Sequence, residues 1–369
     1  MNPFLLKGYL GPKYFCDRAE ESDKLTTALK NNQDVTLYGY RRLGKSALIH
    51  YVFHQLKKEY HCIYSDVWGT ASVEEFTKEL ANGIIKSTVF AKRKLTEKLA
   101  DFLKSIGASF KIGIDGMPSV EMTYNDKNQV FGNLEELFAF LERLSHPVVL
   151  AIDEFQEIKK YDNEIPFEGK LRALTQQCNN VSFLFCGSEY HLLNEIFSTY
   201  NMPFYQSTRM LTINKIGRQE YKEFILRHFK REKRKVSPAV IDHILDITYL
   251  HTYYVQAAAN LLYSQTVLPG SVEEFRYIYK DFILEKRIFY SELPERLTKQ
   301  QFAVVKGFGQ TGIVSTPTSA DFMEKAKIRN SSSMYRVINS LLEKQIIIRD
   351  DEGYRLYDVF LEQFLKCVL

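Results

Sequence analysis

The chain has 369 residues, which is enough for two or three domains, and 45% of them are hydrophobic and 25% charged. This composition is typical of a folded protein and excludes disorder as its main character. The formal net charge of +4 is only mildly basic. Nucleic-acid binding usually comes with a concentrated basic surface, so the charge alone does not indicate it.

The start of the chain and its cysteines favour a cytoplasmic protein with no membrane partner. The opening MNPFLLKGYLGPKYF has neither a long apolar core nor a small-residue cleavage site, and no segment approaches 18 uninterrupted apolar residues. The five cysteines are odd in number and form no CxxC pair. We therefore expect neither a disulfide framework nor a zinc cluster, and we interpret the cysteines as reduced packing residues.

Four short apolar runs in the first half predict buried strands, at residues 34–39, 62–67, 147–153 and 181–187. Longer helical patterns lie between them, which is the sign of a parallel sheet covered by helices. The second and third runs are separated by an insertion. There we expect a helix over 73–87, a charged helix over 92–106, and a β-hairpin over 108–124 that turns at Asp115-Gly116 near the edge of the sheet.

From about Thr212 the pattern becomes helical, and it predicts a separate all-helical unit over 212–294. The last stretch begins near Leu297. It predicts a first helix, a second over 319–328, a third over 331–345, and two short strands that turn at Glu352-Gly353. Three helices followed by a hairpin are typical of a winged-helix domain, here over 295–369.

The segment GYRRLGKS, which follows the first predicted strand, fits a phosphate-binding loop. Such a loop presents backbone N–H groups to anionic oxygens at the N-terminus of a helix, and this requires glycine. Lys45 can reach the β and γ phosphates, and the Ser46 hydroxyl can ligate Mg²⁺. The alternative is a simple glycine turn. We predict an ATP and Mg²⁺ site at Gly39, Tyr40, Arg41, Arg42, Leu43, Gly44, Lys45, Ser46 and Ala47.

The third predicted strand ends in Asp153-Glu154, as a nucleotide hydrolase would require. Asp153 would meet Mg²⁺ beside Ser46, and Glu154 would orient the attacking water. The fourth strand ends in Gly187-Ser188, which would add a small polar group beside the same metal, or would simply cap a turn. The predicted metal ligands are thus Ser46 and Asp153, and the predicted catalytic residues are Glu154, Lys45 and Ser188.

Three arginines remain open to more than one interpretation. Arg209 could sense the γ-phosphate of its own site or of a neighbouring copy, or it could be a solvated surface residue. Arg41 and Arg42, inside the loop, could contact phosphate, pair with carboxylates or stay solvated. The aromatic residues within 249–254 fit helix packing better than adenine contacts.

The motifs occur in a distinctive order: KYFCDRAEESDKL, YGYRRLGKSAL, LAIDEFQEI, LFCGSEYHLL, HTYYVQ and EGYRLYDVFLEQFL. In this the chain resembles the archaeal-type P-loop ATPases of the AAA+/STAND group. The resemblance covers nearly the whole chain. It implies an α/β P-loop NTPase core over 1–211 with an AAA+-like parallel sheet, a helical lid over 212–294, and a C-terminal winged helix over 295–369.

By position, the resemblance gives Lys45 and Ser46 the Walker A roles and Ser188 the sensor-1 role, with Asp153-Glu154 as Walker B. Arg18 matches the arginine of the family's N-terminal GRE-type motif, with aspartate and alanine as its neighbours in place of glycine and glutamate. The lid's usual GNPYY-type turn appears as His251-Thr252-Tyr253-Tyr254, without the glycine and the proline.

Two functions compete on this evidence. The first is a Mg²⁺-dependent, slowly hydrolysing ATP switch, which could form homo-oligomers. The alternative is a DNA-binding regulator that ATP tunes through the winged helix, or a winged helix that contacts protein instead. Its helix over 331–345 carries side chains suited to DNA, whereas the acidic wing 350–352 would repel phosphate. A small-molecule kinase would need an acceptor pocket, and the sequence offers no candidate. The DNA-facing candidates are Ser332, Ser333, Tyr335, Arg336 and Asn339.

Overall fold

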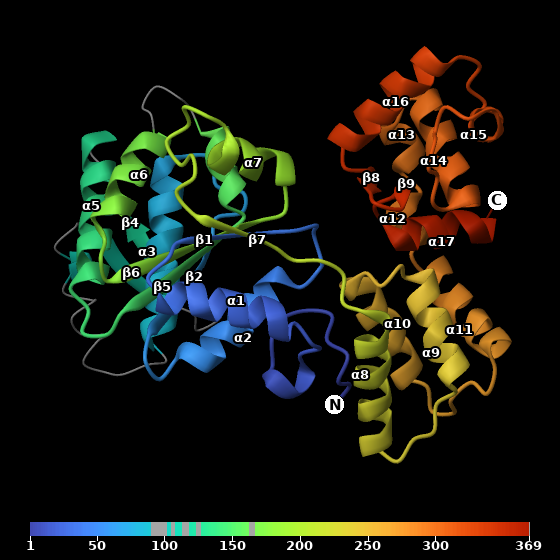
Figure 1. Cartoon of the computed structure of the whole chain (residues 1–369), viewed down its shortest axis with the longest axis horizontal. Coiled ribbons are helices and arrows are strands. Elements are labelled where there is room, and N and C mark those ends of the chain that lie inside the picture. Colours follow the sequence, from blue (N-terminus) through green and yellow to red (C-terminus); the bar gives the residue numbers. More distant parts are fainter. Residues whose placement is uncertain (90–101, 105–107, 113–117, 123–126, 162–166, 369) are drawn as a thin grey trace. The chain divides into compact units, whose positions relative to one another are not determined.

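The chain forms two compact units in the computed structural model, which describes residues 1–89, 102–104, 108–112, 118–122, 127–161 and 167–368 (Figure 1). One unit comprises Lys7–Ile216. The other comprises Gly217–Leu369 together with the first six residues, Met1–Leu6.

The first unit is built on a five-stranded sheet in which all neighbouring strands are parallel. The order is β2 (His61–Asp66), β5 (Val148–Asp153), β6 (Val181–Gly187), β1 (Val35–Tyr38) and β7 (Arg209–Thr212). The four predicted strands are confirmed. The fifth, β7, was not predicted, because its residues are exposed or half-buried and form no apolar run.

Both faces of this sheet are buried, which explains why its central strands are continuously apolar. In β5, Val149 and Ala151 face a core formed with α1 (Ala19–Lys30) and α2 (Lys45–Leu56). Leu150 and Ile152 alternate with them and face the opposite core. Figure 1 shows α1 and α2 on one side of the sheet and α3, α5 and α6 on the other.

The insertion after β2 begins with the predicted helix, now α3 (Val73–Val89). The predicted hairpin strands are also present, as β3 (Ala108–Ile112) and β4 (Pro118–Met122), and they pair antiparallel in a sheet of their own. The N–H of Val120 donates to Asn82 Oδ1 at 2.9 Å, which fixes β4 against α3. The turn at Asp115-Gly116 and most of the predicted charged helix at 92–106 lie outside the described residues.

Before α1 lies the short 3₁₀ helix η1 (Pro12–Tyr14). Further helices among the described residues of this unit lie between strands: α5 (Lys127–Glu142), the 3₁₀ helix η2 (Phe155–Lys160), α6 (Phe167–Gln177) and α7 (Tyr190–Ser198).

The second unit begins with the predicted helical segment. It contains α8 (Arg218–Arg231), α9 (Pro238–Ile247), α10 (Thr252–Tyr263), α11 (Val272–Leu284), α12 (Arg287–Tyr290) and α13 (Leu293–Arg296). The chain turns sharply between α9 and α10, where Tyr249 and Leu250 have φ angles of 51° and 57°. Two consecutive non-glycine residues in the left-handed region end the helical run at this point.

The winged-helix fold follows, with α14 (Lys299–Thr311), α15 (Ala320–Lys325), α16 (Ser331–Glu343), β8 (Ile347–Asp350) and β9 (Gly353–Leu356). The predicted helices and hairpin are therefore confirmed. The side chain of Asn330 accepts a hydrogen bond from the N–H of Ser333 and so fixes the start of α16. A last helix, α17 (Val359–Val368), was not predicted, and its apolar face closes the core of this fold.

Tyrosines of the helical segment bind the start of α17. Tyr254 donates to Asp358 Oδ1 at 3.1 Å, Tyr290 donates to Asp358 Oδ2 at 2.9 Å, and Tyr249 donates to Glu362 Oε1 at 2.6 Å. Tyr254 is only 1% exposed and its ring lies 4.7 Å from that of Phe360. These contacts agree with a packing role for the aromatic residues and join the helical segment to the winged helix within one unit.

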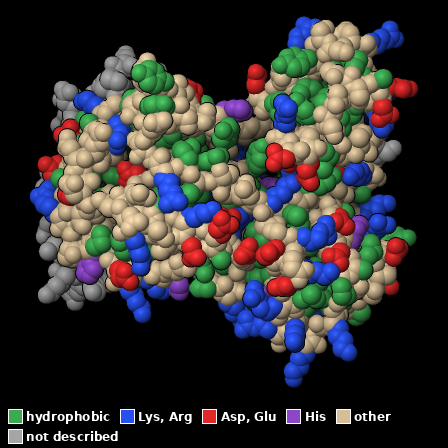
Figure 2. All heavy atoms as spheres, viewed as in Figure 1, with side chains coloured by type: hydrophobic (Ala, Val, Ile, Leu, Met, Phe, Trp, Pro, Cys, Tyr) green, Lys and Arg blue, Asp and Glu red, His purple; other side chains and the backbone are tan. Residues whose placement is uncertain are grey.

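The charged side chains and the cysteines are distributed as the small net charge and the absence of a CxxC pair indicate. Acidic and basic side chains are interspersed over the face shown in Figure 2. All five cysteines are free thiols. Within the described part of the chain, no helix is both long enough and apolar enough to cross a bilayer.

Candidate nucleotide-binding site

The phosphate-type loop lies where the sequence predicts it, between the end of β1 at Tyr38 and the start of α2 at Lys45. Gly44 has a φ of 97°, a conformation that other residues rarely adopt. Gly39 is required by close packing, because a Cβ there would lie 2.4 Å from Ile213 Cγ2 and 2.7 Å from the Ile213 carbonyl oxygen. The two glycines of GxxxxG thus have separate structural reasons.

Arg18 supports this loop from the N-terminal segment. Its guanidinium, 2% exposed, donates to the carbonyl of Leu43 at 2.9 Å and to the carbonyl of Asn214 at 2.7 Å. It also pairs with Glu21 at 2.8 Å. The arginine that matches the family's N-terminal motif therefore holds loop backbone in place.

Lys45 is buried, and its ammonium points back into the loop. It donates to the carbonyl oxygens of Gly39 at 2.8 Å and Tyr40 at 3.1 Å. These acceptors are neutral, whereas phosphate oxygens are anionic and would add a direct charge–charge attraction to the hydrogen bond. The side chain is therefore positioned to exchange carbonyl partners for a polyphosphate.

Ser46, the second residue of α2, meets the end of β5. Its hydroxyl donates to Asp153 Oδ2 at 2.8 Å. The hydroxyl of Tyr64, on β2, donates to the same oxygen. Burial, followed by the charge of Asp153, raises the pKa of Tyr64, so it remains a hydrogen-bond donor at neutral pH. The two predicted metal ligands are thus brought together. Tyr64 is a third member of this hydrogen-bonded group, although not a proposed metal ligand, and sequence reasoning missed it.

Glu154 lies immediately beyond β5 with a φ of 54°, which turns its side chain away from the strand direction. Its Oε2 accepts hydrogen bonds from Ser188 Oγ at 2.8 Å and from Gln156 Nε2 at 2.5 Å. Gln156 is fully buried. The structure thus brings the predicted catalytic glutamate and the predicted sensor serine into contact. Gln156 was missed, since nothing in its sequence position distinguishes it from other polar residues of a 3₁₀ turn.

Arg41 extends from the loop to the segment after β6. Its Nε donates to Ser188 Oγ at 3.1 Å, and its guanidinium lies 3.4 Å from the carboxylate of Glu189. Arg41 is therefore linked to the residues around Glu154.

Asp66 adds a further carboxylate to this edge of the sheet. It ends β2 and is in register with Asp153, the last residue of β5. Burial raises the pKa of Asp66, and the charges of Asp153 and Glu154 add to the shift. Its position at the carboxyl end of a predicted strand was the signal that could have identified it.

The other predicted loop residues occupy different environments. Tyr40 and Arg42 are exposed, and Arg42 has a φ of 64°. Leu43 is buried in the core beneath the loop, and Ala47 is half-buried in the first turn of α2. Only their backbone or the exposed side chains could contact a nucleotide.

Arg209 is not brought to the loop. It is the first residue of β7 and pairs in register with Val35, whereas the loop follows Tyr38, which pairs with Thr212. In a parallel sheet Val35 and Tyr38 mark opposite ends of the strands. Arg209 therefore lies about 10 Å along the strand from the end that carries the phosphate loop. Its geometry therefore does not favour a role at the site of its own chain.

Magnesium fits the residues at the carboxyl edge. Mg²⁺ binds through one or two carboxylates together with substrate phosphates and water. The Ser46 hydroxyl and the Asp153 carboxylate are oxygen donors of this kind and lie in contact. Among the described residues, no three or more His, Cys, Asp or Glu side chains are arranged to hold a metal by themselves.

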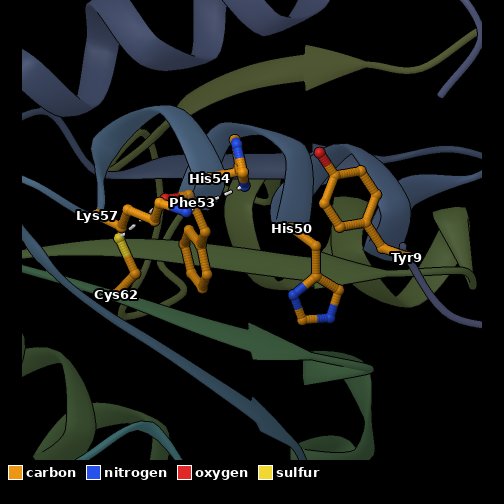
Figure 3. A pocket seen from close by; sticks show the side chains of 6 residues that line it. All are labelled: Tyr9, His50, Phe53, His54, Lys57 and Cys62. Carbon is orange, nitrogen blue, oxygen red and sulfur yellow. Dashed lines mark hydrogen bonds between the residues drawn. The ribbon is translucent and has the colours of Figure 1, made fainter. Parts of the chain in front are cut away.

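A separate pocket of about 360 Å³ lies along α2, and Figure 3 shows side chains of α2 and β2 together with Tyr9 around it. None of the predicted loop or acidic residues lines it. The ring of His50 lies 4.8 Å from that of Tyr64, which links the pocket wall to the partner of Asp153. Burial raises the pKa of Cys62 to about 12, so its thiol is not a nucleophile. The lining residues are Tyr9, His50, Phe53, His54, Lys57 and Cys62.

Two protein families match this chain by sequence. A family described as an ATPase domain predominantly from Archaea matches residues 15–248. The chain belongs to this ATPase family. A probable winged helix domain matches residues 288–367. No curated protein matches the chain by sequence.

Solved structures with the same fold include three archaeal proteins. The Walker-type ATPase of Pyrococcus abyssi is 18% identical, with a TM-score of 0.66 and 99% of each chain covered. The ORC2 protein of Aeropyrum pernix, in ADPNP and ADP complexes, is 12% identical, with a TM-score of 0.61 over 100% of this chain and 96% of that one. The Aeropyrum pernix ORC1 protein in complex with DNA is 13% identical, with a TM-score of 0.50 over 96% and 93%. These likenesses confirm the predicted P-loop ATPase fold.

Proposed function

We propose that the protein is a Mg²⁺-dependent ATP-binding and ATP-hydrolysing conformational switch of the AAA+/STAND type. The observation that carries this proposal is the hydrogen bond between Ser46 and Asp153. Lys45 precedes Ser46 in the chain, and Glu154 follows Asp153. Phosphoryl transfer to water needs a hydroxyl and a carboxylate that hold the metal, an ammonium that binds phosphate, and a second carboxylate that orients the water.

Each of these side chains has a distinct part in the reaction. Lys45 would leave the carbonyls of Gly39 and Tyr40 and bind phosphate oxygens. Ser46 and Asp153 would hold Mg²⁺, which supplies positive charge to the transferring phosphoryl group. Glu154 would orient the attacking water and accept its proton. Its Oε2 accepts hydrogen bonds from Ser188 and Gln156, and this restraint on the carboxylate favours slow basal turnover.

The division into two units supports a switch rather than a simple hydrolase. The nucleotide residues belong to Lys7–Ile216, and the winged helix belongs to the other unit. A ligand shifts a conformational equilibrium only if it binds the states with different affinity. We propose that the γ-phosphate provides this difference and that hydrolysis removes it. ATP with Mg²⁺, but not ADP, would then protect the chain around Ile216-Gly217 from proteolysis.

Phosphate release by the wild type and by Glu154→Gln tests the enzymatic part. We expect the variant to bind ATP and to lose about a hundredfold or more in turnover, as removal of a general base does. Glu136→Gln is the matched control, because Glu136 is an exposed acid of α5, and it should keep wild-type turnover. If the wild type binds no ATP, or turns over no faster than Glu154→Gln, the proposed function is wrong.

Homo-oligomerisation is a further part of the proposal, in which Arg209 would act on a neighbouring copy. Size-exclusion chromatography with light scattering, with and without ATP and Mg²⁺, gives the mass directly. A nucleotide-dependent increase in mass that Arg209→Ala abolishes would support this role. A constant monomer mass would refute it.

A second candidate function, DNA binding that ATP tunes, is favoured by the surface of α16. Tyr335 is 64% exposed and Arg336 is exposed, whereas Met334 and Val337 are buried. The helix thus packs on one face and presents an aromatic and a basic side chain on the other, as a helix that enters the major groove does. The solved structure of the Aeropyrum pernix ORC1 protein with DNA has a similar fold.

The acidic wing opposes DNA less than its sequence indicates. Asp350 pairs with the buried guanidinium of Arg355 at 3.1 Å, so that its charge is compensated within the wing. Asp351 and Glu352 remain exposed. The wing therefore presents two exposed acids, and the third is paired with an arginine of the same wing.

A mobility shift with duplex DNA over a series of salt concentrations tests this second function. Arg336→Ala should lower the affinity and flatten the salt dependence, since each phosphate contact contributes to the slope. Arg296→Ala is the control, because Arg296 is an exposed arginine of the same unit outside α15 and α16. Equal loss in both variants, or binding without a salt slope, would exclude recognition by α16.

A further inference from the structure

Arg41, in the phosphate loop, contacts the serine that holds the proposed catalytic base, Glu154. Its Nε donates to Ser188 Oγ at 3.1 Å, and Ser188 in turn donates to Glu154 Oε2 at 2.8 Å. A hydroxyl that accepts a hydrogen bond from a cation becomes a stronger donor, because each bond in such a chain polarises the next. Arg41 therefore strengthens the restraint that Ser188 places on Glu154.

The contact of Arg41 with Glu189 is weak and easily exchanged. Its guanidinium lies 3.4 Å from Glu189, and the Arg41 side chain is 43% exposed. An ion pair as exposed as this contributes little, because water screens it. A terminal phosphate in the loop that contains Arg41 would carry more charge than Glu189 and would offer oxygens in the geometry that a guanidinium binds bidentately.

We propose that Arg41 is a positioning residue that favours nucleoside triphosphate over diphosphate and releases Glu154 when the triphosphate binds. This inference rests on the proposed ATPase function. It adds Arg41 as the residue through which binding of a triphosphate in the loop affects the proposed base, Glu154. Without triphosphate, Arg41 reinforces the Ser188 to Glu154 hydrogen bond. With triphosphate bound, Arg41 turns to the terminal phosphate, Ser188 loses its cationic donor, and Glu154 is less firmly held.

The proposal predicts a change in selectivity rather than a uniform loss of binding. Calorimetry would compare the non-hydrolysable triphosphate ADPNP with ADP, each with Mg²⁺. We expect Arg41→Ala to lose about tenfold in ADPNP affinity and less than twofold in ADP affinity, because a charge-assisted contact is lost only with the triphosphate. Arg41→Lys should recover part of the ADPNP affinity through its charge. Arg143→Ala, an exposed arginine of the same unit, should match the wild type.

Removing the competing partners of Arg41 tests its release. Glu189→Gln should raise ADPNP affinity about twofold to fivefold, the range expected for loss of an exposed ion pair, and should have no such effect in the Arg41→Ala background. The effect of Ser188→Ala on ADPNP affinity should likewise depend on the background. It should be at least twofold more favourable in the protein that has Arg41 than in the Arg41→Ala variant. This dependence on background is the sign of a partner that must be given up on binding.

Two results would overturn the inference while leaving the ATPase function intact. They are an unchanged ratio of ADPNP to ADP affinity in Arg41→Ala, which includes equal losses of both, and a Glu189→Gln effect that persists without Arg41. Circular dichroism and thermal melting of each variant establish that the fold is kept. If wild-type protein binds neither nucleotide, the proposed function itself fails, and the two failures are thereby distinguished.

Discussion

The hydroxyl of Ser46 donates a 2.8 Å hydrogen bond to Asp153, although 107 positions separate the two residues in the chain. Ser46 follows β1 and Asp153 ends β5, and β6 lies between these two strands in the sheet. Because all the strands are parallel, their carboxyl ends share one edge, where the side chains converge. The pair is therefore formed by the fold before any nucleotide arrives.

Replacing either member of this pair should remove the magnesium dependence of ATP binding. For Asp153→Asn and Ser46→Ala, we expect the ATP affinity measured with Mg²⁺ to fall by about tenfold to a hundredfold, the loss typical of a group that supports a metal. The affinity measured with EDTA should hardly change, because Lys45 and the loop backbone remain. Calorimetric titration under both conditions gives the comparison.

Tyr64→Phe is the informative control for that experiment. It removes the second hydroxyl that donates to Asp153 Oδ2 but none of the proposed magnesium ligands. Magnesium-dependent binding should survive in this variant. If Tyr64→Phe lost the magnesium effect as fully as Asp153→Asn does, the site would depend on the hydrogen-bond network and not on metal ligands.

Much of this site could be predicted from sequence, because its signals are local. Glycine at two fixed positions, an apolar run before them and an acidic pair after another apolar run are each readable in a few residues. Tyr64 and Gln156 could not be found in this way, since their roles come from the neighbouring strand and from a 3₁₀ turn. The position of Arg209 depended on β7, whose mixed exposure gives no strand signal.

The second unit shows the same limit. The helices and the hairpin follow from periodicity and turn residues. The contact of Tyr254 with Asp358 joins residues 104 positions apart, and no local pattern indicates it. The sequence therefore predicted a packing role for the aromatic residues within 249–254, but not the residues they pack against. Helix α17 was missed because it follows the hairpin that we expected to be the last element.

Gly39→Ala should destabilise the first unit. The new methyl would lie 2.4 Å from Ile213 Cγ2 and 2.7 Å from a backbone oxygen, and the backbone cannot move aside as a flexible side chain can. We expect a loss of about 1 to 3 kcal/mol in the free energy of unfolding, as for other overpacked sites, together with weaker ATP binding. Chemical denaturation measures the first effect.

Gly132→Ala supplies the matched control, because it lies within α5 and a Cβ there meets nothing within 4 Å. Alanine in a helix interior should be neutral or more stable by up to about 1 kcal/mol. Opposite signs for the two substitutions are expected. A Gly39→Ala protein as stable as the wild type would show that the loop can open without cost.

Asp358→Ala should destabilise the second unit. Asp358 accepts hydrogen bonds from Tyr254 and Tyr290, and its Oδ1 also accepts from the N–H of Phe360 at the start of α17. Its removal would take away a helix cap and leave tyrosine hydroxyls without this acceptor. We expect a loss of about 2 to 4 kcal/mol. Asp351→Ala, on the exposed wing, should change stability by less than about 0.5 kcal/mol; similar losses in both would contradict the assignment.

Asp34 should make the stability of the first unit depend on pH. Burial raises the pKa of Asp34 from 3.8 to about 6, and the hydrogen bond from the N–H of Phe183 and the charge of Arg172 only partly oppose this. A pKa that is higher in the folded state means that the native protein favours the protonated form. The stabilising effect is therefore complete below about pH 4 and is lost as the pH rises through 6.

Asp34→Asn should remove this dependence. Asparagine keeps an oxygen that can accept from Phe183 N, 2.9 Å away, but carries no charge to bury. Relative to the wild type, the variant should gain about 1 to 3 kcal/mol in the free energy of unfolding between pH 4 and pH 7, an upper limit set by the size of the pKa shift. Denaturant titrations at pH 4, 5, 6 and 7 measure the difference. Asp23→Asn, at an exposed position of α1, should follow the wild-type curve, and an Asp34→Asn curve parallel to the wild type would show that this carboxyl is not the cause.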